Sequence, residues 1–472
     1  MRLTADSVAV RLSRFCVQTG SVSGFYVAVL SFKRMVPVLV PWLVSGALSF
    51  ATAGPVFASS LEEVLAALIL DHPNIRAAYK TVESSREEIK RTASGFYPQI
   101  SVTGDITQEV IDSPAERQQG DGQLGKPSTR TAERGSVSVI QNLFAGFLTT
   151  SSVRTAQLNK ELAQMTLEGT RQNIVFEGIN AYVNVLRQKR LIELSRENEA
   201  TIQRQLNLED ERVQRGSGVA VDVLQAKSRL QVAKERLVTL EGALEDSISR
   251  YTQTFNHVPD INAMTDPVAP VEMVPSQLDR AIDQALVGNP ALGNTSVGIE
   301  VARERKRAVR AELYPTIDLE SAWSFEKNAG ATLGVRRDYS VTLRATWDVF
   351  TGFSTRNLMA QASFDLGARK DTHDFTSRKV IEQTKLAWQA LVTSRKRLEL
   401  LENAVNIASE VFSSRQKLRE AGKETVVSVL DAENEVNNAQ INFTSASYDE
   451  RLAVYQLLLS MGLLNPVGLN LY

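Results

Sequence analysis

Residues 418–443 read LREAGKETVVSVLDAENEVNNAQINF, and residues 214–240 carry an earlier version of the same pattern, QRGSGVAVDVLQAKSRLQVAKERLVTL. A shift of 206 residues aligns a glycine in the two stretches and, after it, a set of apolar and small residues. In the later stretch these residues are Gly422, Val429, Leu430, Ala432, Val436, Ala439 and Phe443. In both stretches these residues are spaced alternately three and four apart, which is the period of a helix packed along a seam. The chain therefore contains an internal duplication.

The duplication extends upstream at a shift of 217 residues, which carries Pro73 onto Pro290 and Tyr97 onto Tyr314. Each of the two prolines interrupts a helical pattern, so we expect each half to begin with two short helices split at that proline. The expected short helices cover residues 61–70, 74–94, 278–287 and 291–313.

After each Tyr-Pro pair the hydrophobic period changes to two, which predicts strands with one apolar and one polar face. The clearest example is the alternation of Tyr339, Val341 and Leu343 with polar residues. Polar connections over residues 111–134 and 327–337 separate the paired strands. The shift that aligns the two repeats decreases from 217 to 206 residues within these connections, as expected if they are exposed loops of different length. The expected strands cover residues 98–109, 135–143, 315–326 and 338–349.

Long helices are expected after the second strand of each half, over residues 148–214 and 354–420, because no proline interrupts either run. At about 1.5 Å per residue each would be roughly 100 Å long, far beyond the usual globular helix. The return helices, residues 219–257 and 425–461, are shorter. Because each return helix is shorter than its long helix, we expect two short helices to be stacked end to end beside each long one: the helix before the strands and the return helix.

These elements divide the chain into two structural repeats, residues 59–257 and 277–465, joined by a proline-rich linker over 258–276 and followed by a tail over 466–472. Residues 1–58 are expected to be an N-terminal extension and a signal peptide, because a basic pair and an apolar run precede a signal-peptidase pattern that ends at Ala58. A single membrane-spanning helix in that segment is the alternative, which its prolines and glycines disfavour.

The composition gives no indication of a nucleic-acid partner, because the net charge is −1 and the basic residues are spread along the chain. Removing residues 1–58 takes away five basic residues and one acidic residue, so 48 basic and 53 acidic residues remain and the net charge becomes −5. It also removes Cys16, the only cysteine. An exported protein of this size without disulfides must be stabilised by packing or by assembly.

Four strands cannot close a barrel, and an open sheet in a bilayer would leave unpaired backbone groups at its edges, each costing several kcal/mol. A membrane barrel would therefore have to be completed by further copies of the chain. No apolar run of about 18 residues follows residue 58, so no membrane-spanning helix is expected there. A soluble α/β protein is the alternative, which the very long helices and the export signal disfavour.

The chain resembles the TolC family of outer-membrane efflux and secretion channels. The resemblance is carried by the two glycine-turn segments at 216–226 and 421–440, the two Tyr-Pro strand starts, the two Phe-x-Gly-Phe turns and the duplication, and it covers about residues 60–465. It implies an α+β membrane protein that forms a homotrimer: a twelve-stranded outer-membrane β-barrel with four strands per chain, continued by a long α-helical coiled-coil tunnel across the periplasm.

The family carries aspartates that ring the periplasmic constriction of the tunnel. The resemblance assigns Asp431 and Asp222 to such a ring, and it places Ser428 where the family has another aspartate. Three copies of Asp431 around a narrow pore would attract cations and repel anions. From the residues alone, Asp431 and Asp222 could equally be solvated acids that stabilise the start of a helix.

Family members also hold the closed state with an arginine and a tyrosine near this turn, and here those positions are Glu424 and Arg419, so a different closing network is expected. Gly216, Gly218 and Gly422 are interpreted as left-handed turn positions at which a periplasmic adaptor protein docks. Plain helix termination is the alternative for these glycines.

No catalytic constellation is recognisable, and we expect no enzyme activity, cofactor or metal. The segment that starts at Gly216 fails the dinucleotide-loop pattern because no strand precedes it. The three histidines, His72, His257 and His373, have no metal-ligand spacing.

The interpretation that fits these observations is a passive exit duct in the outer membrane of a Gram-negative bacterium, extending into the periplasm. The resemblance implies as partners outer-membrane lipid, a periplasmic adaptor and an inner-membrane pump of the RND or ABC type. Efflux of toxic or hydrophobic small molecules is the favoured role. Type I protein secretion and a non-conducting coiled-coil surface protein remain alternatives.

Overall fold

The structure is a computed structural model, and it describes residues 60–114, 127–330 and 333–465. The signal peptide expected over residues 1–58 and the tail expected over 466–472 lie outside the described residues.

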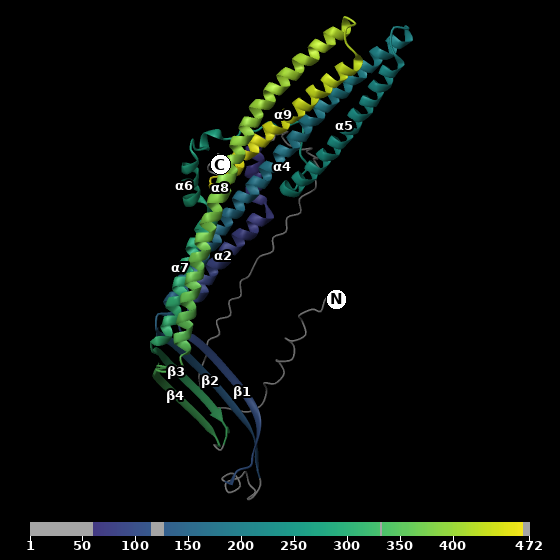
Figure 1. Cartoon of the computed structure of the whole chain (residues 1–472). Helices are drawn as coiled ribbons and strands as arrows, with labels where there is room; N and C mark the ends of the chain where they lie inside the picture. The colour runs from purple at the N-terminus through teal and green to yellow at the C-terminus, as the bar shows by residue number, and fades with distance from the viewer. Residues whose placement is uncertain (1–59, 115–126, 331–332, 466–472) are drawn as a thin grey trace, which may run out of the picture. The chain divides into compact units, whose positions relative to one another are not determined.

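Both repeats contain the same succession of elements (Figure 1). The first consists of α1 (Leu61–Asp71), α2 (Pro73–Ala93), η1 (Ser94–Phe96), β1 (Gln99–Ile111), β2 (Ser128–Ala145), α4 (Leu148–Gln214) and α5 (Ala220–Phe255). The second consists of α6 (Leu278–Gly288), α7 (Pro290–Arg310), η3 (Ala311–Leu313), β3 (Thr316–Lys327), β4 (Val335–Thr346), α8 (Ser354–Glu420) and α9 (Val426–Ser460). The short helix η2 (Val271–Met273) lies between the repeats.

The break between the two short helices of each repeat is a capped helix start. His72 Nδ1 accepts a hydrogen bond from the backbone N–H of Asn74 (3.3 Å), and Asn289 Oδ1 accepts one from Ala291 (2.9 Å). A proline follows each cap at the first helical position, where its missing N–H costs nothing. The residue pairs His72-Pro73 and Asn289-Pro290 therefore end one helix and begin the next, as predicted.

The long helices α4 and α8 cover the two proline-free runs and have 67 residues each. Each begins after a left-handed pair, with φ of 59° and 69° at Gly146 and Phe147 and of 62° and 66° at Gly352 and Phe353. A phenylalanine seldom adopts this conformation. Edge-to-face contacts at 5.4 Å with the aromatic ring three residues earlier hold Phe147 and Phe353 in it.

The four strands form one antiparallel sheet in the order β1-β2-β3-β4. Ser101 lies opposite Ser138 with their hydroxyl oxygens 2.6 Å apart, whereas Val102 lies opposite Val137 on the other face. The apolar face continues across the sheet from Val137 to Trp323 and Tyr339. The sheet therefore has one polar and one apolar face, as the alternation predicted.

Strand β2 is longer than expected, because residues 128–134 were predicted to lie in the polar connection and are paired with β1 from Asp105 to Ile111. This segment has no apolar alternation, so its pairing with β1 could not be recognised from hydrophobicity. Strand β4 ends at Thr346, short of the expected 349, and the Trp347 indole N–H donates to the Leu313 carbonyl (3.2 Å) instead.

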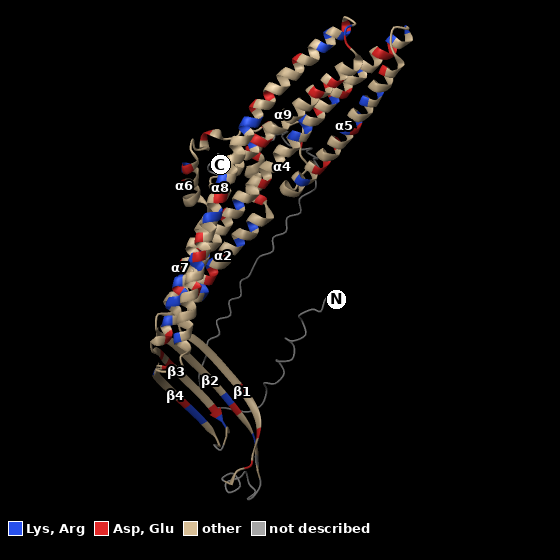
Figure 2. Cartoon of the chain, viewed as in Figure 1, with Lys and Arg blue, Asp and Glu red and all other residues tan. Residues whose placement is uncertain are grey.

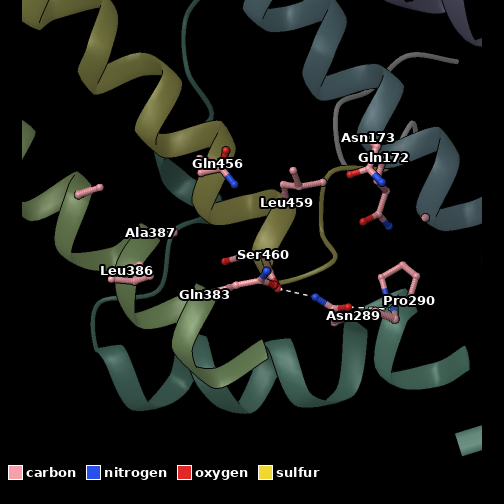
Figure 3. A pocket seen from close by; sticks show the side chains of 13 residues that line it. Gln172, Asn173, Asn289, Pro290, Gln383, Leu386, Ala387, Gln456, Leu459 and Ser460 are labelled. Carbon is pink, nitrogen blue, oxygen red and sulfur yellow. Dashed lines mark hydrogen bonds between the residues drawn. The ribbon is translucent and has the colours of Figure 1, made fainter. Parts of the chain in front are cut away.

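The helices continue from one end of the sheet, and the α4–α5 and α8–α9 turns lie at the far end from the strands (Figure 1). Helix α4 packs against α2 and α5 of its own repeat and against α7 and α9 of the other. In the second repeat α9 ends where α7 begins, and Asn289 Nδ2 donates to the Ser460 carbonyl at 2.9 Å (Figure 3). The two short helices beside α8 therefore meet end to end, as the lengths suggested.

A pocket of about 560 Å³ lies at this junction, between α4, α8 and the α9–α7 contact (Figure 3). Its polar lining is mostly side-chain amides, those of Gln172, Asn173, Asn289, Gln383 and Gln456.

The largest apolar cluster lies where α1, α4, α9 and the linker meet. The Tyr182 hydroxyl donates to the Thr265 carbonyl (2.9 Å) and accepts from the Thr265 N–H (3.1 Å), and Tyr448 donates to Asp266 (2.9 Å). These bonds fix the linker along α4 and α9. Among the described helices, none combines the length and the apolar character needed to cross a membrane.

Candidate functional site

The candidate site consists of the tips of two helical hairpins, α4–α5 and α8–α9, at the end of the structure farthest from the sheet. Both long helices end in the same hydrogen-bonded motif: the Gly216 and Gly422 N–H groups donate to the third residue before them (2.9 and 3.0 Å), and the next N–H donates to the fifth before it (2.9 Å in both). Gly216 and Gly422 have φ of 76° and 71°, a left-handed conformation that glycine adopts without strain. The two turns are therefore structurally equivalent.

Gly218 is not a left-handed position, contrary to the prediction from sequence. Glycine is required there by space instead, because a Cβ atom at Gly218 would lie 2.7 Å from the Val213 backbone nitrogen. The turn folds back tightly onto the end of α4, and a larger residue at 218 would push the two apart.

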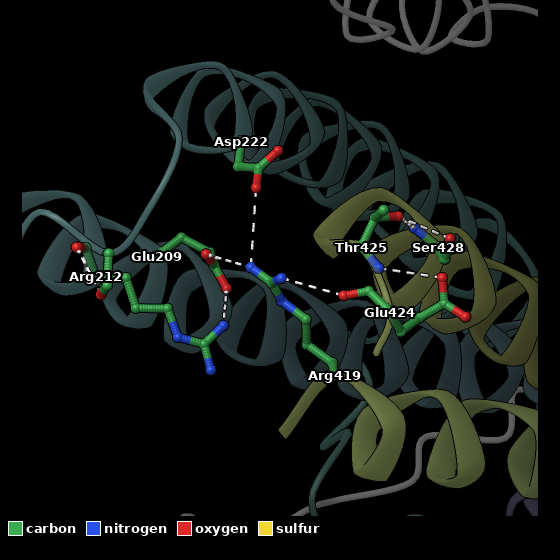
Figure 4. Close-up of polar contacts among 8 residues, drawn as sticks. Glu209, Arg212, Asp222, Arg419, Glu424, Thr425 and Ser428 are labelled. Atoms are coloured by element: carbon green, nitrogen blue, oxygen red, sulfur yellow. Dashed lines mark hydrogen bonds and ion pairs between the residues drawn. The ribbon is translucent and has the colours of Figure 1, made fainter. Parts of the chain in front are cut away.

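Arg419, in the last turn of α8, joins the two tips (Figure 4). Its Nη2 lies 2.9 Å from Glu209 Oε2 of α4 and 3.9 Å from Asp222 Oδ2 of α5. Its Nη1 donates to the Glu424 carbonyl (3.1 Å), which fixes the guanidinium against its own turn. One side chain of the second repeat thus contacts both helices of the first repeat's hairpin.

Glu209 is the anion at the centre of this network, and sequence reasoning missed it. Its side chain is 2% exposed and also accepts from Arg212 Nη1 at 2.7 Å. Charge-assisted bonds of this kind are stronger than neutral ones, and burial reduces their screening by solvent. The sequence did contain a signal. The spacing that packs one helix along another recurs at Ile202, Leu206, Glu209 and Val213, so Glu209 occupies a position at which this pattern predicts an apolar residue.

Asp222 and Asp431, the two acids predicted to ring a constriction, are both paired with arginines of the other hairpin. Asp431 Oδ1 of α9 lies 2.6 Å from Arg229 Nη2 of α5, and Asp222 lies 3.9 Å from Arg419. Both members of the Asp431–Arg229 pair are about half exposed. Asp222 is also in the first turn of α5, where an acid stabilises the helix dipole.

Ser428 and Glu424 have local roles at the start of α9. The Thr425 side chain caps the helix by accepting from the Ser428 N–H (3.3 Å), and the two hydroxyls are 2.9 Å apart. Glu424 accepts from the Thr425 N–H (3.1 Å), and hydrogen bonds from the Ser428 side chain and this N–H lower the pKa of Glu424. The carboxylate of Glu424 is therefore held beside the Thr425 cap at the start of α9, whereas the neighbouring Arg419 makes the contacts across the two hairpins.

The strands carry a second group of charged residues (Figure 2). Arg344 makes two bonds of 2.9 Å to Glu320 across β3 and β4, and Arg134 pairs with Asp105 (3.2 Å) and Glu109 across β1 and β2. These pairs lie on the face that bears the serine and threonine hydroxyls, so charge is kept off the apolar face along most of the sheet.

Aromatic side chains gather where the strands meet the helices. The Phe147 ring lies 5.4 Å from Phe144 and 6.0 Å from Tyr314, both edge to face, and Trp347 and Phe350 are exposed at the same junction of the second repeat. Exposed aromatic residues next to an apolar sheet face are typical of a membrane–water interface. In the described parts of the chain, no group of three or more His, Cys, Asp or Glu side chains is placed to hold a metal ion.

Comparison with known proteins identifies the family. The sequence profile described as outer membrane efflux protein matches residues 64–253 and 281–463, which together make up most of the chain. The outer membrane efflux protein BepC of Brucella suis is 23% identical over 414 residues, covering 87% of each chain. The outer membrane protein TolC of Escherichia coli is 22% identical, covering 93% of this chain and 88% of its own.

The alkaline protease secretion protein AprF of Pseudomonas aeruginosa is 21% identical over 326 residues, 67% of this chain and 68% of its own. The fold is similar to that of the outer-membrane channel OprN, with a TM-score of 0.74 and 16% identity over 85% of this chain and 89% of that one. The chain belongs to the outer membrane efflux protein family, as the resemblance to TolC predicted, and it is an outer-membrane efflux channel protein.

Replacing Arg419 with Gln tests the network at the tips. The change leaves the buried Glu209 with Arg212 as its one charged partner, so we expect the tips to lose about 2 kcal/mol of stability. Hydrogen exchange of the amides at 417–425 should accelerate accordingly. Arg215→Gln is the matched control: its pair with Glu211 is exposed at both ends, so the cost should be at most about 0.5 kcal/mol. Equal effects of the two changes would contradict the role given to Arg419.

Proposed function

We propose that three copies of this chain assemble into one exit duct, a twelve-stranded barrel in the outer membrane continued by a helical tunnel in the periplasm. The observation that supports the proposal is that two equivalent helices, α4 and α8, are not equally covered by neighbouring helices. Helix α4 packs extensively against helices of both repeats, whereas α8, among the described residues, packs extensively only against α6, α7 and α9 of its own repeat. One long helix is therefore surrounded and its counterpart has a free side.

Matched positions on the two helices locate the free side. Leu194 of α4 is 9% exposed and packs in a cluster with Ile441 of α9, while its counterpart Leu400 of α8 is 69% exposed. Leu158 is 3% exposed and its counterpart Phe364 is 79% exposed. The free face of α8 would be covered if a second copy supplied α2 and α5 in the way that the second repeat supplies α7 and α9 to α4.

Such an interface is heterologous, because the face of α8 meets a different face of the next copy. Helix α5 offers a suitable partner face, with the exposed residues Val221, Leu224, Val232 and Val238. A heterologous contact closes into a ring when the rotation between copies allows it. Three copies of the four-stranded sheet then supply the twelve strands expected for the family.

The sheet supports insertion of the ring in a bilayer. Its apolar face carries Trp323, Tyr339, Val341 and Leu343, all substantially exposed in the single chain, and its polar face carries the ion-paired charges. Adding neighbours at β1 and β4 would satisfy the backbone groups at both edges, which hydrocarbon requires. The aromatic junction residues would then lie at the periplasmic interface of the membrane.

The hairpin tips are proposed as the periplasmic constriction, with Asp431 and Asp222 facing it and the Ser428–Glu424 cap beside them. The pairs Arg419–Glu209 and Asp431–Arg229 hold the two hairpins of one chain together, so they favour a narrow opening. The turns at Gly216, Gly218 and Gly422 are proposed to receive a periplasmic adaptor protein, which connects the duct to an inner-membrane pump of the RND or ABC type.

The proposed cargo is toxic or hydrophobic small molecules, which pass through the duct without chemical change. Similarity to BepC and TolC favours this role, and similarity to the secretion protein AprF favours protein export as the second candidate. A non-conducting coiled-coil surface protein is the third, which the two-faced sheet disfavours.

The interface between copies is tested by Leu400→Asp on α8. A charge on the proposed contact face should prevent trimer formation while leaving the single chain folded, because Leu400 makes little contact within it. Native mass spectrometry of the detergent-solubilised protein, with circular dichroism for helix content, measures both properties. Glu402→Gln is the control, since Glu402 and its counterpart Arg196 are both exposed. Trimers of the Leu400→Asp variant would refute this interface.

The constriction is tested in planar bilayers by two changes of opposite sign. Asp431→Ala removes an anion near the opening and should lower the preference for cations, while Arg229→Gln removes the cation that neutralises Asp431 and should raise it. The reversal potential under a salt gradient measures both shifts. Unchanged potentials in both variants would exclude Asp431 from the constriction, and the absence of any conductance steps would refute the duct itself.

Deletion of the gene separates efflux from secretion. If the chain serves efflux, the deletion strain should become several-fold more sensitive to hydrophobic drugs and dyes, with an unchanged set of secreted proteins. Minimal inhibitory concentrations and the secreted proteome, measured on the same cultures, give the two outcomes. Loss of one secreted protein with unchanged drug sensitivity would assign the duct to protein export.

A further inference from the structure

A buried polar layer interrupts the contact between α9 and α4. Five residues of α9 that are at most 9% exposed follow one another at helical spacing, and they are Val426, Leu430, Glu433, Asn437 and Ile441. The third and fourth of them, Glu433 and Asn437, are polar, and the other three are apolar. This seam is distinct from the glycine turns and from the Arg419 network.

The residues on either side of the layer belong to apolar clusters. Val426 and Leu430 pack with Ile202 and Leu206 of α4 and with residues of α5, and Ile441 packs with Leu191 and Leu194 of α4. Glu433 and Asn437 lie between these clusters along α9. Ser195 of α4, 1% exposed, lies between the same clusters along α4. The layer is therefore closed on both sides by packed hydrocarbon.

The polar atoms in this layer lack partners. Within the described residues, neither carboxyl oxygen of Glu433, nor Asn437 Oδ1, nor the Ser195 hydroxyl has a hydrogen bond. An ionised carboxylate without a partner is expensive to bury, and such a group takes up a proton instead. A protonated Glu433 can donate to Asn437 Oδ1, four residues on and on the same face of the helix, so one proton satisfies an atom of each residue.

We propose that Glu433 is a proton-binding site built into the packing of α9 against α4, and that its protonation stabilises the contact between the two helical hairpins. The proton lies on a carboxyl oxygen and is shared with Asn437 while the hairpins are packed. It is released to water when they separate and the carboxylate becomes hydrated. The proposal concerns packing within one chain, so it stands whether or not the chain conducts.

The charged groups around Glu433 leave this site unneutralised. From α4, Arg204 acts on it and lowers its pKa slightly, but the Arg204 side chain is exposed and donates to Thr201. From α5, Arg229 and Arg236 are each bound to a residue of α9 other than Glu433, namely Asp431 and Asn438. From α8, Arg415 donates to the Ser428 carbonyl.

Burial raises the pKa of Glu433 from 4.5 to about 7, in agreement with this geometry. The separated, hydrated residue would keep the ordinary value of 4.5. The packed arrangement therefore gains its full stabilisation below that value and loses it progressively as the pH rises to about 7. The hairpins should be held together most firmly at acidic pH and should separate more readily at neutral and alkaline pH.

Infrared spectroscopy of the full-length protein in detergent tests the site directly. A carboxylic-acid carbonyl band should disappear with a midpoint near pH 7 in the natural protein, should be missing in Glu433→Gln, and should persist in Glu435→Gln, which alters an exposed acid two residues away. Carbon-13 labelling of glutamate shows whether the band belongs to a glutamate in the unaltered chain, so a glutamate midpoint near pH 7 can still be measured if a variant fails to fold. A midpoint near 4.5, or a band that persists in Glu433→Gln, would overturn the proposal.

Distances between spin labels test the consequence for the hairpins. Labels at Ser217→Cys and Lys423→Cys, one in each turn, can be introduced after Cys16, the only cysteine, is replaced by Ser. In labelled protein diluted with unlabelled chains, so that distances within one chain are measured, the distance distribution should shift to longer values between pH 5.5 and pH 8, and Glu433→Gln should abolish the shift while Glu435→Gln retains it. A distribution that does not change with pH, or a shift that survives in Glu433→Gln, would refute the coupling.

Discussion

Unpaired backbone groups at the edges of a membrane sheet are the constraint on which the rest of the structure depends. Strands β1 and β4 are the two edges of a four-stranded sheet whose apolar face carries exposed aromatic and branched side chains. Hydrocarbon offers no hydrogen bonds, so the edges must be paired by protein. The register that joins β2 to β3 within the chain gives the geometry that neighbouring copies would repeat from β4 to β1.

The duplication explains how one chain can be folded and still leave part of its repeated apolar pattern exposed. Leu430 of α9 is 4% exposed because it packs on α4, whereas its counterpart Leu224 of α5 is 64% exposed. The same pattern is thus packed in the second repeat and left exposed in the first. The counterparts of Glu433 and Asn437 are Lys227 and Gln231, so the buried polar layer belongs to the contact inside the chain and has no equivalent on α5.

Charge and packing have different tasks along the helices. One apolar cluster joins α4 to α9 close to the turns, where Val426 and Leu430 pack with Ile202 and Leu206, and the ion pairs Arg419–Glu209 and Asp431–Arg229 join the hairpins in the same region. Apolar contacts hold the shape under most conditions, whereas the half-exposed pair Asp431–Arg229 responds to salt and to competing charges, and the pair of Arg419 with the buried Glu209 does so less. The tips are therefore held by packing and by charge together, and salt or competing charges act only on the charged part of this contact.

The sequence by itself determined the elements: the lengths of α4 and α8 from the absence of proline, the strands from their alternation except for residues 128–134 of β2, and the helix breaks at Pro73 and Pro290. These features depend on residues close together in the chain. Only the tertiary structure decided that Arg419 bonds to Glu209, that Asp431 is neutralised by Arg229, and that Gly218 is needed for space and not for a left-handed turn. Those contacts join residues about 200 positions apart, or depend on how tightly a turn closes. A local sequence pattern predicts which face of a helix is buried. The packing of the two repeats against each other determines which residues contact that face.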